Sequence, residues 1–424
     1  MDPSERAARI VRTATETLQP RFAVELWTGE RIGPPTGPVL KINDKDAIGK
    51  IVRRPSFETL LKLWISKALD VEDGTLFDII AQRPEMRTSS AWRALPKLQL
   101  LRDIPALLFG GGGNEADARL VSSDPFASGS DRAAITHHYD ISNDFYRLFL
   151  DRNMVYSCGY FTDFANGIDQ AQTDKLDHIC KKLRLQPGER LLDIGCGWGA
   201  MLIHAAKNYG VTGHGVSLSE AQSALARERV RAEGLEDRIT IEVKSYTELD
   251  RSFDKISSIG MFEHTGIANH DAYFEAIHRL LKPGGIYLHH AITRRNKPGR
   301  NAWRRKNPAN RALAKYIFPG GEVDYIGRTI GMLEAHRFEV HDVENLREHY
   351  ARTCRLWAER LHARFGEAIK EVGEPKARLW LFYLTGCSVA FDRGSLLIYQ
   401  TVATRRTRGP SGLPPTRADL YSDR

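Results

Sequence analysis

Short apolar runs and longer helical patterns alternate between residues 190 and 291, and this alternation limits the possible folds more than any other feature. RLLDIG (190–195) and FDKISSIGMF (253–262) have the length and composition of buried strands. Between and beyond them lie helical patterns, such as residues 199–210, which end at a glycine. Strands that alternate with helices of about 10–15 residues predict βαβ units and a mostly parallel sheet.

The rest of the chain divides by composition. Residues 1–108 combine short strand patterns with an amphipathic helix (57–69), which predicts a smaller α+β domain. Residues 109–131 are rich in Gly, Ser and Asp and predict a linker, and residues 132–405 form the main domain. The Pro/Gly/Arg-rich tail, 406–424, is expected to be disordered.

The second half of the main domain carries a weaker strand signal. Residues 323–391 are predicted to be largely helical. Residues 396–405, LLIYQTVATR, predict a final strand that adds to the edge of the sheet.

Composition excludes several classes of protein. No apolar run approaches the ~18 residues of a membrane-spanning helix, and the charged N-terminus lacks the apolar stretch of a secretory signal. The cysteines form no CxxC pair, so neither a zinc site nor a disulfide framework is expected, and no metal site is predicted. These are Cys158, Cys180, Cys196, Cys354 and Cys387.

The turn LLDIGCGWGA (191–200) predicts a cofactor site. Asp193 precedes three alternate glycines, Gly195, Gly197 and Gly199, which allow a tight turn and a close approach of the backbone to a ligand. The sequence lacks the GK[ST] ending of a phosphate loop and, because its acid comes before the first glycine, differs from the GxGxxG of nicotinamide enzymes. The alternative is a tight strand-to-helix turn without a ligand.

The acid-first order resembles the DxGxGxG motif of class I S-adenosylmethionine-dependent methyltransferases. This implies an α/β, Rossmann-like fold with a mostly parallel, seven-stranded sheet, and S-adenosylmethionine as cofactor. Asp193 would lie beside the amino-acid end of the cofactor. Many such folds place an acid at the end of the second strand to bind ribose, but this chain has Ser217 there and Gln222 shortly after.

Several separate motifs then identify a family. From about His137 to Arg405 the chain resembles the cyclopropane-fatty-acyl-phospholipid synthases and the mycolic acid cyclopropane synthases. The motifs are HHYDISNDFYRLFLD (137–151), MVYSCGYF (154–161), LLDIGCGWG (191–199), GVSLSEAQ (215–222), IGMFEHTG (259–266), KYIFPGG (315–321) and FYLTGCSVAF (382–391).

The resemblance implies that residues 1–108 form a lipid-handling domain, and it also implies two sets of site residues. Cofactor contacts would come from Tyr156 and Ser157 at the amino-acid end, Asp193 with Gly195, Gly197 and Gly199 in the loop, Ser217 (usually Thr in the family) and Gln222 at the ribose, and Tyr246 at the adenine. A bicarbonate ion at the reacting centre would be held by Cys158, Glu263, His290, the backbone of Ile292 and Tyr350, with Cys387 nearby.

Glu263 and His290 are the strongest chemical candidates. Glu263 directly follows an apolar run, and a buried carboxylate is costly unless it has a partner. Side chains alternate along a strand, so His290 and not His289 should face the site, and His264 is expected to be structural. Aromatic residues would keep the site dry. The candidates are Tyr156, Tyr160, Phe161, Phe262 and Phe318.

The resemblance implies that the cis double bond of an unsaturated phospholipid acyl chain attacks the cofactor's methyl group, and that bicarbonate, oriented by Glu263 and His290, then removes a proton so that a cyclopropane ring closes. One alternative is a methyl-branched unsaturated acyl chain. A more distant alternative is N-methylation of a small amine.

Charge distribution bears on the partners. Residues 294–315 contain nine Lys or Arg and no acid, which fits either a solvated loop or contact with phosphates, of nucleic acid or of anionic lipid head groups. The resemblance to enzymes of lipids favours an anionic membrane surface. The sequence holds no nucleic-acid module, so no nucleic-acid partner is expected. We expect a cytoplasmic protein attached peripherally to the inner face of the membrane, with a homodimer as its assembly.

Overall fold

The computed structural model describes residues 3–81, 141–296 and 322–421. They divide into two units: a smaller one of residues 3–81 and 373–385, and a larger one of the other described residues. The predicted linker, 109–131, and the boundaries on either side of it lie outside the described residues. The domain limits therefore stay predictions.

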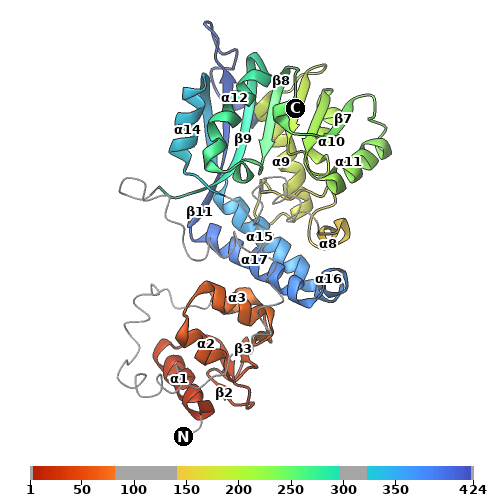
Figure 1. The fold of residues 1–424 in the computed structure, drawn as a ribbon. Coiled ribbons are helices and arrows are strands. Elements are labelled where there is room, and N and C mark those ends of the chain that lie inside the picture. The colour runs from red at the N-terminus through yellow and green to blue at the C-terminus, as the bar shows by residue number, and fades with distance from the viewer. Residues whose placement is uncertain (1–2, 82–140, 297–321, 422–424) are drawn as a thin grey trace. The chain divides into compact units, whose positions relative to one another are not determined.

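The smaller unit combines helices with a four-stranded sheet of order β2-β1-β3-β4 (Figure 1). Strand β1 is parallel to β3 and antiparallel to β2, and β3 is antiparallel to β4. Its elements are α1 (Pro3–Leu18), β1 (Ala23–Glu25), β2 (Arg31–Ile32), β3 (Val39–Ile42), α2 (Ala47–Arg53), α3 (Phe57–Ile65), β4 (Leu69–Glu72) and α4 (Leu76–Ala81).

Residues 373–385 join this unit through Arg378. Its guanidinium lies 4.0 Å from the ring of Trp64 and donates hydrogen bonds to the carbonyls of Trp64 (2.6 Å) and Leu69 (2.9 Å). Asp70 supplies the opposite charge at 3.2 Å. A buried arginine with these partners is satisfied, so the contact is part of the unit's core.

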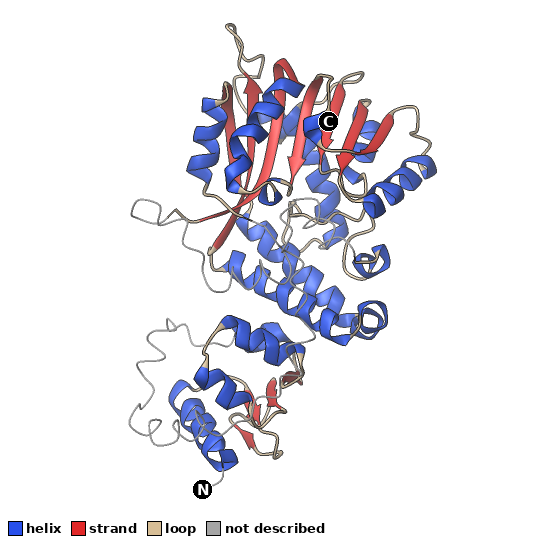
Figure 2. Ribbon diagram, in the orientation of Figure 1, coloured by secondary structure: helices blue, strands red, loops and turns tan. Residues whose placement is uncertain are grey.

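The larger unit is built on a seven-stranded sheet of order β10-β11-β9-β8-β5-β6-β7 (Figure 2). All neighbours are parallel except β11, which is antiparallel to both β9 and β10. This confirms the predicted α/β fold of class I methyltransferases. The strands are β5 (Arg190–Ile194), β6 (Thr212–Ser217), β7 (Ile239–Val243), β8 (Phe253–Ile259), β9 (Leu281–Arg294), β10 (Phe338–Asn345) and β11 (Leu396–Arg405).

Helices cover both faces of this sheet. Leu191 and Leu192 are neighbours on β5 and point to opposite faces. Leu191 packs in a core with α9, α10 and α11, whereas Leu192 packs in a second core with α12 and α14. The helices of the unit are α8 (Asn143–Arg147), α9 (Ile168–Leu183), α10 (Ala200–Tyr209), α11 (Glu220–Ala232), α12 (His270–Leu280), α14 (Ile326–Ala335), α15 (Arg347–Ala363) and α16 (Phe365–Val372). Helix α17 (Glu374–Asp392) contributes residues 386–392.

One strand prediction was wrong. Strand β11 lies inside the sheet, between β9 and β10, and not at its edge. Residues 323–391 are largely helical, as predicted, but they also contain strand β10, which was not predicted. Strand β10 pairs with β11, which begins more than 50 residues later in the chain. No local sequence pattern contains this pairing.

The C-terminal tail also differs from the disorder that its composition predicts. The structure describes it as far as residue 421, with a short 3-10 helix, η6 (Ala418–Leu420). Leu420 is buried, and Asp419 forms an ion pair with Arg184 on the larger unit at 2.9 Å. Arg417 pairs with Asp342 on β10. These ion pairs and the buried leucine hold the tail against the sheet.

Candidate active site

The glycine turn after β5 adopts a backbone that only glycine readily accepts. Gly195, Gly197 and Gly199 have φ angles of 77°, 52° and 81°. A Cβ atom on Gly195 would lie 3.0 Å from the Cγ of Met261, while Gly197 has nothing within 4 Å of such an atom. Gly199 is the N-cap of α10. The turn therefore brings bare backbone to the carboxyl edge of the sheet.

Asp193 closes the base of the turn. Its side chain is 3% exposed and accepts a hydrogen bond from the Oγ of Ser257 at 2.7 Å. Burial raises the pKa of Asp193 to about 6, although Ser257 and the charge of Lys175 oppose that rise. A buried carboxylate of this kind gains from a cationic ligand such as the ammonium group of an amino acid.

Lys175 is a site residue that the sequence analysis missed. It lies on α9, is 1% exposed, and donates a hydrogen bond to the Oγ of Ser157 at 3.0 Å. Burial lowers the pKa of Lys175 to about 8, although Asp151, Cys158 and Asp193 oppose that fall. The available signal was its position in the apolar stripe of α9, between Gln172 and Ile179, where a lysine is out of place.

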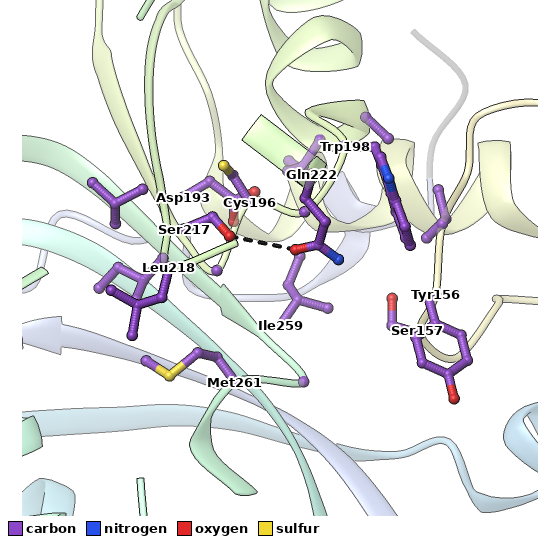
Figure 3. A pocket seen from close by; sticks show the side chains of 18 of the residues that line it. Tyr156, Ser157, Asp193, Cys196, Trp198, Ser217, Leu218, Gln222, Ile259 and Met261 are labelled. Carbon is purple, nitrogen blue, oxygen red and sulfur yellow. Dashed lines mark hydrogen bonds between the residues drawn. The ribbon is translucent and has the colours of Figure 1, made fainter. Parts of the chain in front are cut away.

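Ser217 and Gln222 lie together at the end of β6, as predicted for the ribose subsite. The Oγ of Ser217 donates to the Oε1 of Gln222 at 3.3 Å (Figure 3). Ser219 caps α11 and so fixes the start of the helix that carries Gln222. Tyr246, predicted at the adenine, lies in a short 3-10 helix, η2 (Tyr246–Glu248), which has a capping box.

One pocket collects these groups, and it contains about 1020 Å³ of empty space, part of it open to solvent. All the predicted cofactor residues line it except Gly199. In Figure 3, Asp193 and Ser217 lie on one side of the pocket, with Tyr156, Ser157 and Trp198 across from them. Residues without a predicted role also line it. They are Met154, Val155, Lys175, Leu176, Ile194, Cys196, Trp198, Ala200, Met201, Val216, Leu218, Lys244, Ser245, Ile259, Gly260, Met261 and His264.

His264 was predicted to be structural, yet it lines the pocket. Burial lowers its pKa to about 4, so the imidazole is neutral at neutral pH. Of the aromatic residues expected to line the site, Tyr156 does so, whereas Tyr160 stacks between His178 and His349. Phe318 lies outside the described residues.

The predicted catalytic residues do not line this pocket, but Glu263 lies between two residues that do, Met261 and His264. Glu263, in the 3-10 helix η3 (Phe262–His264), is 8% exposed, and its Oε1 accepts a hydrogen bond from the backbone N–H of Ile292 at 2.6 Å. Its Oε2 is buried and has no hydrogen-bond partner among the described residues. Burial raises the pKa of Glu263 to about 7, although the Ile292 N–H opposes that rise.

His290, on β9, is 1% exposed. Burial, with the charges of Lys175 and Lys182, lowers its pKa well below 6.5. Its Nε2 is buried without a hydrogen-bond partner in the described part of the chain. Its carbonyl accepts from the N–H of Gly260, which lines the cofactor pocket. His289 faces the other way, toward Phe262 and Tyr287, as the strand alternation predicts.

Tyr350, Cys158 and Cys387 form a third part of the site. Burial raises the pKa of Tyr350 well above 10, and both cysteines and Tyr156 lie near enough to contribute. The thiol of Cys158 donates to the carbonyls of Gly159 (3.2 Å) and, more weakly, Leu346 (3.7 Å). Burial also raises the pKa of that thiol, so it stays protonated. Tyr156 thus links this cluster to the cofactor pocket.

The donor set of the predicted catalytic residues fits a small oxyanion. Because burial raises the pKa of Glu263 to about 7, its carboxyl group can hold a proton at neutral pH and donate a hydrogen bond. Neutral His290 can donate from a ring N–H. The N–H of Ile292, predicted as a further ligand, donates to Glu263 in this structure instead. The described residues contain no group of three potential metal ligands.

Comparison with known proteins places the chain in a family. Residues 127–401 match the model of the mycolic acid cyclopropane synthetase family. The chain is 35% identical to a probable fatty acid methyltransferase of Pseudomonas putida over 96% of its own length and 98% of that protein. It is 39% identical to the cyclopropane-fatty-acyl-phospholipid synthase of Escherichia coli, over 63% of this chain and 66% of that protein.

A solved structure supports the same assignment. The larger part of the chain superposes on the mycolic acid cyclopropane synthase CmaA1 complexed with SAH and CTAB, with a TM-score of 0.61 and 35% identity. The match covers 65% of this chain and 99% of that one. The chain therefore belongs to the mycolic acid cyclopropane synthetase family and is an S-adenosylmethionine-dependent methyltransferase.

Proposed function

We propose that the protein transfers a methyl group from S-adenosylmethionine to the cis double bond of an unsaturated phospholipid acyl chain and closes a cyclopropane ring. One observation carries the proposal: two polar atoms of the predicted catalytic residues, Glu263 Oε2 and His290 Nε2, are buried without hydrogen-bond partners among the described residues. An enzyme that only transferred a methyl group to an amine would gain nothing from such a pair, because the amine itself can release the proton.

The names of the relatives support an acyl substrate. The Pseudomonas putida relative, which matches nearly the whole chain, is named a probable fatty acid methyltransferase. The Escherichia coli relative is named a cyclopropane-fatty-acyl-phospholipid synthase. An alkene is a weak nucleophile, and the bound S-adenosylmethionine would supply a strongly electrophilic methyl group. Methyl transfer to an alkene leaves a carbocation on the acyl chain, which must then lose a proton.

Glu263 and His290 would manage that proton. Bicarbonate, when bound, would supply the base. Glu263 holds its carboxyl group against the Ile292 N–H through Oε1, which leaves Oε2 to donate to the anion. His290 is too deeply buried to become charged and would donate from its ring N–H. A neutral lining of this kind orients an anion without competing with it for the substrate's proton.

Two buried groups of opposite charge at the cofactor end would match the two charges on the amino-acid part of the methyl donor. Asp193 would receive its ammonium group, and Lys175, beside Ser157, would receive its carboxylate. Tyr156 borders the pocket, and its ring centroid lies 5.3 Å from that of Trp357 and 5.5 Å from that of Tyr146. Aromatic faces at this position would exclude water and stabilise a cation.

A methyl-branched unsaturated product is the second candidate. The observation in its favour is the name of the relative that matches nearly the whole chain, a fatty acid methyltransferase. In this case the same cation loses a different proton and the double bond is kept. Small-amine methylation has only the fold in its favour: coclaurine N-methyltransferase shares the architecture at 21% identity.

Mass spectrometry of fatty acid methyl esters distinguishes these products. The full chain is expressed in a host that lacks its own enzyme of this kind, with a vector control, and double bonds are derivatised in parallel. Gain of one CH2 with loss of the double bond supports the proposal. Gain of one CH2 with the double bond retained supports the methyl-branched product. Unchanged acyl chains would refute both.

We also propose that the basic segment 294–315 attaches the enzyme to anionic lipid. Most of it lies outside the described residues, but its first members, Arg294 and Arg295, border a surface cleft with Tyr325. Each Lys or Arg near an anionic surface contributes on the order of 1 kcal/mol. Sedimentation with phosphatidylglycerol vesicles should show binding that 1 M salt abolishes. Binding that molar salt leaves unchanged would contradict this attachment.

A further inference from the structure

Gln400 lies beside the predicted catalytic His290 because of the register of two strands. Strands β9 and β11 are antiparallel, and His290 and Gln400 are directly opposite each other. Residues opposite each other in such a pair have neighbouring side chains on one face of the sheet. The Nε2 of Gln400 lies 3.1 Å from the Nδ1 of His290, and Gln400 is fully buried.

Packing alone does not explain a glutamine at this position. Its neighbours on the same face of β11, Ile398 and Val402, are both apolar and both 2% exposed. A buried amide costs free energy unless its polar atoms are paired. The backbone pairing of β9 with β11 would be the same with a leucine here.

Lys182 determines which way the amide of Gln400 points. The Nζ of Lys182 lies 2.9 Å from the Oε1 of Gln400. An ammonium group has only donors, so the atom that faces it must be the amide oxygen. The amide nitrogen must then face His290, where it donates its hydrogen to Nδ1. An Nδ1 that accepts carries no proton, so in the neutral ring the proton is on Nε2.

Lys182 is itself held in place. It is 1% exposed and forms ion pairs with Glu344 at 2.5 Å and with Asp342 at 3.5 Å. Glu344 is bound on its other side by the Nε2 of His178 at 2.9 Å. Two carboxylates therefore hold the Lys182 ammonium group in place, so it cannot turn away from Gln400.

We infer that Lys182 and Gln400 are positioning residues that hold His290 as the tautomer with its proton on Nε2. The free Nε2–H of His290 then points a hydrogen-bond donor at the oxyanion of the reacting centre. The role in turnover rests on the proposed function, whereas the tautomer follows from the hydrogen bonds alone. In general, the hydrogen bond made by one ring nitrogen of a histidine determines which of the two nitrogens carries the proton.

Gln400→Glu tests the tautomer directly, because it keeps the shape of the side chain and exchanges a donor for an acceptor. A carboxylate held by Lys182 would accept a hydrogen bond from a protonated Nδ1. The full-length protein is labelled with ¹⁵N-histidine, and His290 is assigned by the signals lost in His290→Asn. We expect Nδ1 to be unprotonated in the wild type and protonated in Gln400→Glu. A protonated Nδ1 in the wild type, or the same tautomer in both proteins, would overturn the inference.

Turnover and cofactor affinity then test the function of the tautomer. Gln400→Glu should lower turnover roughly 10- to 100-fold, as is usual for partners that orient a site residue, while the affinity for S-adenosylhomocysteine stays the same. Lys182→Met should also lower turnover, whereas Lys181→Met, which breaks only a more exposed pair with Asp177, should not. Full turnover in Gln400→Glu with a reversed tautomer would remove the positioning role. A wild type that modifies no acyl chain would refute the proposed function and leave the tautomer result standing.

Discussion

Replacing Glu263 with glutamine should stabilise the folded protein at pH 8. The Glu263 carboxyl group is buried, and burial raises its pKa from 4.5 to about 7. Glutamine has the same shape and can accept the same hydrogen bond from the Ile292 N–H. It carries no charge, so the variant removes the cost of burying one.

The size of the effect follows from the two pKa values. Between pH 4.5 and about pH 7 the folded protein holds a proton on Glu263 that the unfolded chain has released. Stability therefore falls as the pH rises through this window, and the whole penalty is present above pH 7 and absent below pH 4.5. Each unit of pH contributes about 1.4 kcal/mol, which gives about 3 kcal/mol at pH 8.

Urea unfolding of the wild type and Glu263→Gln at pH 5 and pH 8 measures this difference. We expect the variant to be about 3 kcal/mol more stable at pH 8 and less than about 1 kcal/mol more stable at pH 5. The affinity for S-adenosylhomocysteine should be unchanged, because Glu263 does not line the cofactor pocket. Glu339→Gln, at an exposed position on β10, is the matched control and should change neither stability nor turnover. A difference in stability that is the same at both pH values would refute the reasoning.

Two further substitutions test the cofactor pocket. Lys175→Met should raise the dissociation constant for S-adenosylhomocysteine roughly 10-fold or more in calorimetry, because it removes a buried cation beside two predicted contacts, while Lys181→Met should leave it unchanged. Gly195→Ala should destabilise the fold by about 1–2 kcal/mol through its positive φ and also weaken cofactor binding, because the new methyl group would press against Met261. Gly188→Ala has a similar φ and open space, so it should show the loss of stability in thermal unfolding without the loss of binding.

Much of the fold follows from local patterns. The alternation of buried runs and helical segments from Arg190 onward predicts the parallel part of the sheet, since period and length depend on neighbouring residues. The same holds for the cofactor subsite. The order of Asp193 and the three glycines requires a positive-φ turn at a strand end, and the structure has that turn. The family motifs add the residues around the reacting centre, whose roles stay predictions.

Contacts between distant segments decided the remaining features. Strand β11 lies inside the sheet because the chain returns after α17 and pairs with both β9 and β10. The local sequence LLIYQTVATR predicts a strand but does not determine which strands pair with it. The same pairing sets Gln400 opposite His290, and α9 brings Lys182 to them from more than 100 residues away. Local sequence determines the conformation that a segment prefers. Which polar group meets which, and so where a proton rests, depends on register and burial that only the folded chain establishes.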